Sequence, residues 1–178
     1  MSDASASHRS PIIRVFDCFV VRAEAEGLGS RTTSKVAPRT EPLHLLLRRA
    51  TDKVYGGDWR MIGGKIRPDE TAWQACLREI QEETQLPIDE LWTVPYVNRF
   101  YEWQRDRIND IPVFLGITRS ASPILDEEHD AFEWLPAEEA AQRLVWPAQR
   151  EGLRAADRFF RDPGALVEHC RIDIGHPR

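Results

Sequence analysis

A glycine pair followed by a run of acidic residues is the part of this sequence that could do chemistry. From Gly63 to Leu86 it reads GGKIRPDETAWQACLREIQEETQL. In an α-helix, residues three and four apart lie on one face, so Glu79, Glu82 and Glu83 would form a carboxylate cluster. The same spacing predicts an adjoining, mostly apolar stripe that faces the core. Its members are Trp73, Leu77, Ile80 and Thr84.

This carboxylate cluster favours a bound cation over an ordinary solvated helix face. Like charges at helical spacing repel by roughly a few tenths of a kcal/mol per pair, and no base follows Arg78 in the predicted helix. Carboxylate oxygens without neighbouring Cys or His select hard ions, Mg²⁺ or Mn²⁺, rather than zinc. Because Mg²⁺ usually shares its coordination sphere with substrate phosphates, the cluster predicts a nucleotide or another phosphorylated substrate.

The segment resembles the signature of the Nudix (MutT-like) hydrolases, Gly-x5-Glu-x7-Arg-Glu-U-x-Glu-Glu-x-Gly-U, where U is an aliphatic residue. Gln85 is the one departure, at a position where the family usually has Gly. That position lies just after the helix, where a left-handed backbone costs a residue with a side chain about 1 kcal/mol. The departure therefore concerns the end of the helix and not the carboxylates. The matched positions are Gly64, Glu70, Arg78, Glu79, Ile80, Glu82, Glu83 and Leu86.

The resemblance implies an enzyme that cleaves a nucleoside diphosphate linked to another moiety, by attack of water at a phosphorus. It implies that Glu79 and Glu83 are the best metal ligands, with Glu82 as a further ligand or a bridge to a second cation. The backbone carbonyl of Gly63 could complete the coordination sphere. Glu79 is the first choice for the catalytic base, and a residue outside the segment is the alternative.

Two further residues of the motif are expected to support the carboxylates. Arg78 is expected to orient the glutamates through charge-assisted hydrogen bonds rather than to contact substrate. Glu70 is expected to tie the glycine loop to the helix. The resemblance implies that Arg78, together with Glu79 and Glu82, belongs to the catalytic machinery.

A second informative stretch, EEHDAFEWLPAEEAAQRLVWPAQR, follows the predicted strands. It resembles the region after the catalytic sheet in Nudix nucleoside-triphosphate pyrophosphatases, including the dATP and dihydroneopterin-triphosphate enzymes. By that match Glu128 is a candidate distal metal ligand or base, and a solvated loop glutamate is the alternative. Arg48 and Arg49 could meet substrate phosphates, because the planar guanidinium suits phosphate, or could lie on the surface. Trp146 could stack on a base or pack between helices.

The substrate is less clearly indicated than the chemistry. The Glu128 region favours a nucleoside triphosphate, cleaved to monophosphate and pyrophosphate. Dinucleoside polyphosphates and nucleotide sugars are the alternatives, although Tyr96 and Tyr101 do not stand at the spacing associated with dinucleoside polyphosphate hydrolases. A Nudix module that binds nucleotides without turnover is the alternative of another class. The presence of every carboxylate of the Nudix signature argues against it.

Strands and helices alternate around these residues and must position them. We predict strands at 12–21, 43–49, 59–62, 91–103, 111–119 and 130–136 from their β-branched and aromatic residues. We predict helices at 70–84, with Asp69 as the N-cap, and at 137–144 and 147–161. This order favours an α/β (α+β) sandwich with a mixed central sheet between helices, which the resemblance also implies.

Length and composition fit a single domain. The chain has 178 residues, of which 42% are hydrophobic and 30% charged, which is close to the average of globular proteins. We predict a flexible leader at 1–10, one domain at 11–163 with a mobile insertion loop at 23–41, and a C-terminal tail at 164–178. Of the three cysteines, Cys76 is expected to be a small packing residue.

The same data restrict the partners. No apolar run approaches the ~20 residues of a transmembrane helix, and the polar start MSDASASHRS lacks the apolar core of a signal peptide. A cytoplasmic location without membrane partners is therefore expected. The net charge of −5 argues against broad nucleic-acid binding. The sequence does not decide the oligomeric state, and a homodimer is one of the alternatives.

Overall fold

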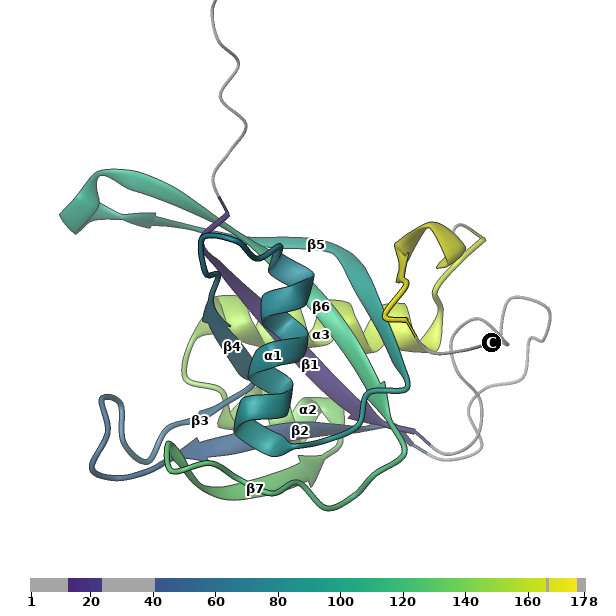
Figure 1. Ribbon diagram of the computed structural model, residues 1–178, viewed down its shortest axis with the longest axis horizontal. Coiled ribbons are helices and arrows are strands. Elements are labelled where there is room, and N and C mark those ends of the chain that lie inside the picture. Colours follow the sequence, from purple (N-terminus) through teal and green to yellow (C-terminus); the bar gives the residue numbers. More distant parts are fainter. Residues whose placement is uncertain (1–12, 24–40, 166, 176–178) are drawn as a thin grey trace, which may run out of the picture.

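The computed structural model describes residues 13–23, 41–165 and 167–175, and it forms a mixed sheet between helices (Figure 1). The strands are β1 (Val15–Arg22), β2 (Leu43–Arg49), β3 (Trp59–Arg60), β4 (Ile62–Lys65), β5 (Glu90–Glu102), β6 (Arg107–Thr118), β7 (His129–Leu135) and β8 (Arg171–Ile172). The α-helices are α1 (Ala72–Thr84), α2 (Ala137–Arg143) and α3 (Pro147–Arg161). The predicted sandwich is confirmed. The leader at 1–10 and nearly all of the loop at 23–41 lie outside the described residues.

Strand β1 lies at the centre of the sheet. The strand order is β3-β2-β1-β6-β5-β8, while β4 pairs with β1 and β7 with β2. Only β1 and β6, among the described strands, pair in parallel. The glycine pair, expected in a loop, lies within β4, where Gly63 is opposite Asp17 and Gly64 opposite Phe16. Pairing with the central strand therefore fixes the glycines firmly.

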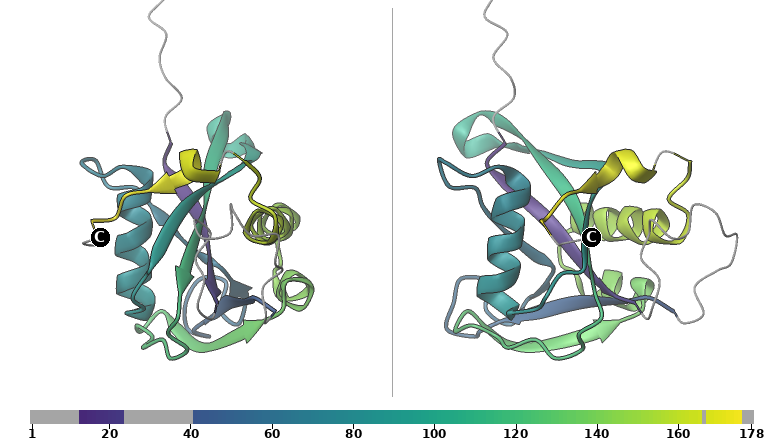
Figure 2. Two further views of the ribbon diagram at one scale, coloured as in Figure 1. Left: turned by 90° about the vertical axis from the view of Figure 1, so that its right-hand side faces the viewer. Right: turned by 45° about the vertical axis from the view of Figure 1, so that its right-hand side comes forward.

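Two apolar layers cover the two faces of the sheet. Successive side chains of a strand point to opposite faces, so Phe16, Cys18 and Val20 of β1 join the cluster under α1, whereas Phe19 and Val21 join the cluster under α2 and α3. Figure 2 shows α1 on one side of the sheet and the other two helices opposite. Because its side chains alternate in direction, the single strand β1 contributes to both cores.

The predicted apolar stripe of α1 is confirmed only in part, because Ile80 and Thr84 are buried as predicted while the rest of the buried face lies to one side of Trp73 and Leu77. Ala75 and Cys76 are fully buried, whereas Trp73 and Leu77 are only partly buried at the edge of the cluster. Small side chains let the helix axis approach the sheet closely, and the bulky residues are left at the margin. This rotation of the buried face brings Glu83 to the inside of the helix, where its side chain is 7% exposed.

Both ends of α1 follow from local hydrogen bonds. The prediction of Asp69 as N-cap is wrong, because Thr71 caps the helix. Its hydroxyl accepts from the Gln74 N–H at 3.4 Å, and its own N–H donates to Gln74 Oε1 at 2.9 Å, which is a capping box. At the other end Gln85 adopts the left-handed conformation with φ of 51°, and its N–H donates to the Gln81 carbonyl.

The remaining differences from prediction lie in the second half. Strand β5 agrees with its prediction to within one residue, whereas β6 begins at Arg107 rather than at 111, because cross-strand pairs such as Arg99 and Asp110 extend the ladder into the segment between the two predicted strands. The C-terminal segment, predicted as a tail, includes the strand β8 paired with β5, and Val167 is fully buried. None of the helices in the described part of the chain is long and apolar enough to cross a membrane.

The left-handed Gln85 generates a stability prediction. Replacing Gln85 with Gly should relieve the left-handed strain, partly offset by the greater freedom of the unfolded chain, for a net gain of about 0.5 kcal/mol. Such a gain raises the melting temperature by roughly 1–2 °C for a chain of this size. Gln81→Gly, at an exposed position inside the same helix, should instead cost about 1 kcal/mol. Equal destabilisation of both variants in thermal melts would contradict the strain at Gln85.

Candidate active site

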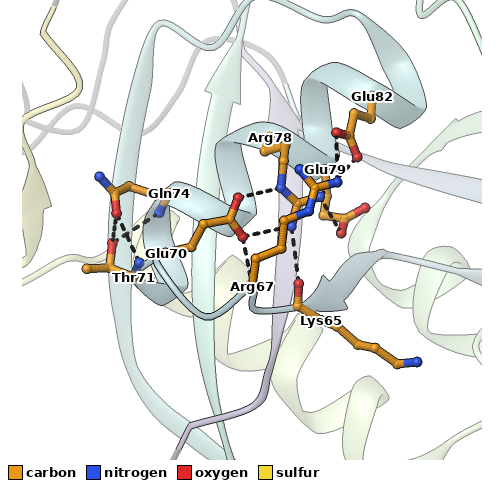
Figure 3. A network of polar contacts seen from close by, with 8 residues as sticks. All are labelled: Lys65, Arg67, Glu70, Thr71, Gln74, Arg78, Glu79 and Glu82. Carbon is orange, nitrogen blue, oxygen red and sulfur yellow. Dashed lines mark hydrogen bonds and ion pairs between the residues drawn. The ribbon is translucent and has the colours of Figure 1, made fainter.

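The guanidinium of Arg78 joins four groups at the exposed edge of α1 (Figure 3). Nη1 donates to Glu79 at 2.7 Å and to Glu82 at 2.9 Å. Nε and Nη2 form a bidentate pair with Glu70 at 2.6 and 3.0 Å, and Nη2 also donates to the Lys65 carbonyl at 3.1 Å. The orienting contacts expected of Arg78 are therefore present, and they link the helix to β4 and to the connection between them.

Glu70 fastens the connection between β4 and α1, as expected from the sequence. Besides its pair with Arg78, its carboxylate accepts from the Arg67 N–H at 3.1 Å. The hydrogen bond from Arg78 is the main reason why the pKa of Glu70 falls to about 2. Glu70 therefore stays ionised throughout the neutral range, and the ion pair that orients Arg78 is always formed there.

Glu79 lies directly against Gly64. A Cβ atom built at Gly64 would lie 2.5 Å from Glu79 Oε1 and 2.6 Å from its carboxyl carbon. No side chain larger than hydrogen fits between β4 and the carboxylate in this position. A side chain at position 64 would therefore displace the Glu79 carboxylate from its place between Gly64 and Arg78.

Glu83 is the buried member of the acidic cluster. Glu83 is 7% exposed, whereas the Glu82 side chain is 48% exposed and contacts Arg78 and Arg67. Burial, followed by the charges of Glu79, Asp126 and Glu128, raises the pKa of Glu83 to about 8. The helix and the loop before β7 therefore bring four carboxylates close enough to repel one another, which is the electrostatic condition that a cation relieves.

The loop before β7 is organised by Asp126 and Arg49. Asp126 accepts from the Glu128 N–H at 3.1 Å and bonds His129 Nδ1 at 2.9 Å, while Arg49 Nη1 donates to Glu128 Oε2. The Asp126 N–H donates to the carbonyl of Glu83 at 3.4 Å. The structure thus brings Glu128 to the buried end of the cluster, and His129 is a buried residue that helps to hold the loop.

The two arginines at the end of β2 point to opposite faces. Arg49 shares the α1 face with Leu45 and Leu47 and lies beside Glu83. Arg48 faces the other way, where it pairs with Asp130 at 2.6 Å and lies over the ring of Trp59. The structure therefore separates Arg48 from the carboxylates.

Arg60, at the end of β3, is a site residue that sequence reasoning missed. Burial, and then the neighbouring Arg49, lower the pKa of Arg60, while Glu83 acts in the opposite direction. Arg49 and Arg60 each retain a buried Nε that finds no hydrogen-bond partner among the described residues. Two adjacent guanidinium groups with spare donors beside a carboxylate cluster suit a phosphate group.

Trp146 lines a pocket next to the glycine pair. It is 50% exposed and meets Tyr55 edge to face, with ring centroids 6.5 Å apart. The pocket has a volume of about 310 Å³ and includes Gly63 and Gly64 in its wall. Trp146 is thus available for the substrate contact predicted for it, whereas Trp134 packs against the core.

The donor set fits a hard divalent cation, although it is not assembled around one. Glu79, Glu83 and Glu128 supply carboxylate oxygens, and Glu83 is buried among the charges of the other carboxylates. In the described part of the chain, no three His, Cys, Asp or Glu side chains meet in metal-coordinating geometry. Arg78 holds Glu79 and Glu82 at the edge of the cluster. Binding of a cation would therefore require side-chain rotation.

Comparison with known proteins assigns these features to a family. Residues 36–156, which include the glycine pair, all of α1 and Glu128, match the family model described as NUDIX domain. The chain belongs to the Nudix family. Its fold resembles that of a Caenorhabditis elegans Ap4A hydrolase, with a TM-score of 0.61, 18% identity and coverage of 83% of this chain and 97% of that one.

Two curated relatives differ in how much of their length is matched. This Nudix chain is 32% identical over 116 residues to the CTP pyrophosphohydrolase of Escherichia coli (strain K12), which covers 62% of this chain and 79% of that protein. It is 30% identical over 115 residues to an octanoyltransferase of Myxococcus xanthus, which covers 63% of this chain. The match spans only 31% of the octanoyltransferase.

The buried carboxylate of Glu83 generates a pH-dependent prediction for the metal-free protein. Its pKa is about 8 in the folded state against 4.5 in the unfolded chain, so folding favours the protonated form and stability is lost as the pH rises from about 4.5 to about 8. Glu83→Gln should therefore melt above the wild type at pH 9 in EDTA and close to it at pH 5. Each kcal/mol corresponds to about 2–4 °C.

Glu82→Gln is the matched control, since Glu82 is exposed and paired with two arginines. This variant should show no gain that grows with pH. Mg²⁺ should raise the melting temperature of the wild type at pH 9 and not that of Glu83→Gln. A pH-independent difference between Glu83→Gln and the wild type would show that Glu83 is not the strained carboxylate.

Proposed function

We propose that this protein is a metal-dependent Nudix hydrolase that cleaves a phosphoanhydride bond of a nucleotide. The preferred substrate is a nucleoside triphosphate, and the products are the monophosphate and pyrophosphate. The observation that carries the proposal is the buried Glu83, with Glu79 and Glu128 around it and the guanidinium groups of Arg49 and Arg60 beside it. The 32% identity to a CTP pyrophosphohydrolase supports the triphosphate class.

The metal is Mg²⁺, with Mn²⁺ as a substitute, because the available ligands are hard oxygens. Glu79, Glu83 and Glu128 would hold it, with Glu82 and the carbonyl of Gly63 as further ligands. Once bound, the ion supplies positive charge that offsets the phosphates and makes a bound water more acidic.

The side chains of the protein position the phosphates and the proton. Arg49 and Arg60 bind phosphate oxygens through their unpaired Nε–H groups. Glu79 accepts the proton of the attacking water, whose oxygen forms a bond to phosphorus as the anhydride P–O bond breaks. The pyrophosphate leaves with the electron pair of that bond. Arg78 acts as a positioning residue, because it holds Glu79 through Nη1.

Dinucleoside polyphosphates are the second candidate class. The chain is 25% identical over 121 residues to the asymmetrical bis(5'-nucleosyl)-tetraphosphatase of Mus musculus, which covers 81% of that protein. The same carboxylates could act on either class, since both present a metal-chelating anhydride. The cytoplasmic location and the homodimer stay predictions.

The experiment that tests the proposed function is a substrate panel in ¹⁸O-labelled water with Mg²⁺. The panel contains the common nucleoside triphosphates, 8-oxo-dGTP, dihydroneopterin triphosphate, Ap4A and ADP-ribose. We expect pyrophosphate and a monophosphate from one or more triphosphates, with the label in one product and no turnover in EDTA. Cleavage of Ap4A alone would favour the second class, and no Mg²⁺-dependent cleavage of any compound would overturn the proposed function.

Gly64→Ala links any turnover to this site. Because the added methyl group would displace the Glu79 carboxylate, activity should fall by roughly 10²-fold, the cost of a catalytic group moved by about 1 Å. Gly116→Ala is the matched control, since its added methyl group would make ordinary contacts of 3.5 Å with Ile88 and 3.6 Å with Val20. Full activity of folded Gly64→Ala would exclude Glu79 from the reaction.

A further inference from the structure

The pocket at Trp146 lies beside the carboxylate site but on the opposite side of the glycine pair from Glu79. Its walls come from the start of β1, from the β3–β4 segment and from the beginning of α3. Gly63 and Gly64 belong to its wall, and Gly64 also contacts Glu79. A nucleotide whose phosphates lie at the carboxylates can therefore place its base in this pocket. Its volume of about 310 Å³ lies at the lower end of small-molecule sites, which range over about 300–1,000 Å³.

Two hydrogen-bond acceptors in the pocket wall can each accept a further hydrogen bond. Asp17 is 5% exposed and accepts one side-chain hydrogen bond, from Asn98 Nδ2 at 3.1 Å to Oδ2. Its other oxygen, Oδ1, lies 3.7 Å from a Cβ built at Gly63. Gln149 Oε1 is buried and finds no hydrogen-bond partner in the described residues. Buried acceptors without donors cost free energy, so a ligand that donates to them is favoured.

The rest of the pocket suits a flat aromatic ring. The half-exposed indole of Trp146 and the side chain of Met61 form an apolar part of the wall. Arg60, whose guanidinium lies 5.7 Å from the ring centre of Tyr55, belongs to the same wall and has a spare Nε donor. A flat ring that donates hydrogen bonds matches this combination of acceptors and apolar surface, while the Nε of Arg60 serves the phosphates at the edge of the pocket.

We propose that this pocket binds the nucleobase and selects bases that carry an exocyclic amino group, with Asp17 and Gln149 as the acceptors. This inference rests on the proposed function, because it assumes a nucleotide whose phosphates lie at the carboxylate site. Guanine and cytosine present amino donors on their pairing edges. Hypoxanthine lacks the amino group of guanine, and uracil has a carbonyl in place of that of cytosine. Neither acceptor belongs to the Nudix signature, so base selection is separate from the metal site.

The test compares bases that differ at the amino group. We expect the protein to prefer GTP over ITP and CTP over UTP by about tenfold or more in kcat/KM, because the poorer base leaves a buried acceptor unpaired. Gln149→Met and Asp17→Asn should each reduce that preference, and Gln142→Met, at an exposed position of α2, should leave it unchanged. Equal kcat/KM within both pairs, or an unchanged preference in folded Gln149→Met and Asp17→Asn, would overturn the inference.

Binding without catalysis separates this inference from the proposed function. Calorimetric titration in EDTA with GMP against IMP, and with CMP against UMP, should show the same order of affinity. If no triphosphate is cleaved but this order of affinity appears and is lost in Gln149→Met, the proposed function fails and the base pocket stands. If triphosphates are cleaved without any preference within the pairs, the base pocket fails and the proposed function stands.

Discussion

The ion-pair network of Arg78 is the interaction on which the site depends. One guanidinium, 16% exposed, bonds three carboxylates and the backbone of β4. Its planar array of donors can satisfy these groups together, which the single ammonium of a lysine cannot do. Because the network spans α1, β4 and the connection between them, it sets the position of Glu79 relative to the glycine pair. Removal of the guanidinium would leave several carboxylates uncompensated, a costly arrangement for partly buried charges.

Small residues make this arrangement possible. Ala75 and Cys76 bring α1 close to the sheet, and Gly64 leaves room for the Glu79 carboxylate. The same close approach carries Glu83 into a poorly hydrated position, where its neighbours raise its pKa. The fold thus accepts a destabilising buried carboxylate at the place where a cation and a phosphorylated ligand would relieve it. Such local conflicts are expected at functional sites rather than in the core.

Much of the fold and of the metal-site chemistry could be predicted from the sequence. The strand and helix patterns are strongly periodic, and the spacing of the Nudix signature fixes which glutamates share a helix. The opposite orientation of Arg48 and Arg49 also follows from the period of two in β2, since Arg49 has the same parity as the buried Leu45 and Leu47. Because Leu46 is buried as well, the alternation predicts only that the two arginines face opposite ways and does not say which of them meets the carboxylates.

Other parts of the site depend on contacts between distant segments. Arg60 lies in a two-residue strand whose position beside Arg49 is set by β2–β3 pairing, and Asp126 lies in a loop with no periodic pattern. The small residues Ala75 and Cys76, rather than the larger Trp73 and Leu77, decide which side of α1 faces the sheet. Hydrophobicity alone predicts that the larger Trp73 and Leu77 face the sheet, so the burial of Glu83 could not be derived from the helical pattern.

Arg78 positions the carboxylates of α1 so that rotation of their side chains is enough to complete a site for a divalent ion. Mn²⁺ titrations monitored by electron paramagnetic resonance test this arrangement on the wild type and on Arg78→Lys. Arg67→Lys is the control, because among these glutamates the Arg67 side chain contacts only the exposed Glu82. The account predicts that Arg78→Lys stays folded and loses about 10–100-fold in Mn²⁺ affinity, as for other residues that orient metal ligands, while Arg67→Lys binds nearly as the wild type does. Unchanged Mn²⁺ affinity in folded Arg78→Lys would contradict it.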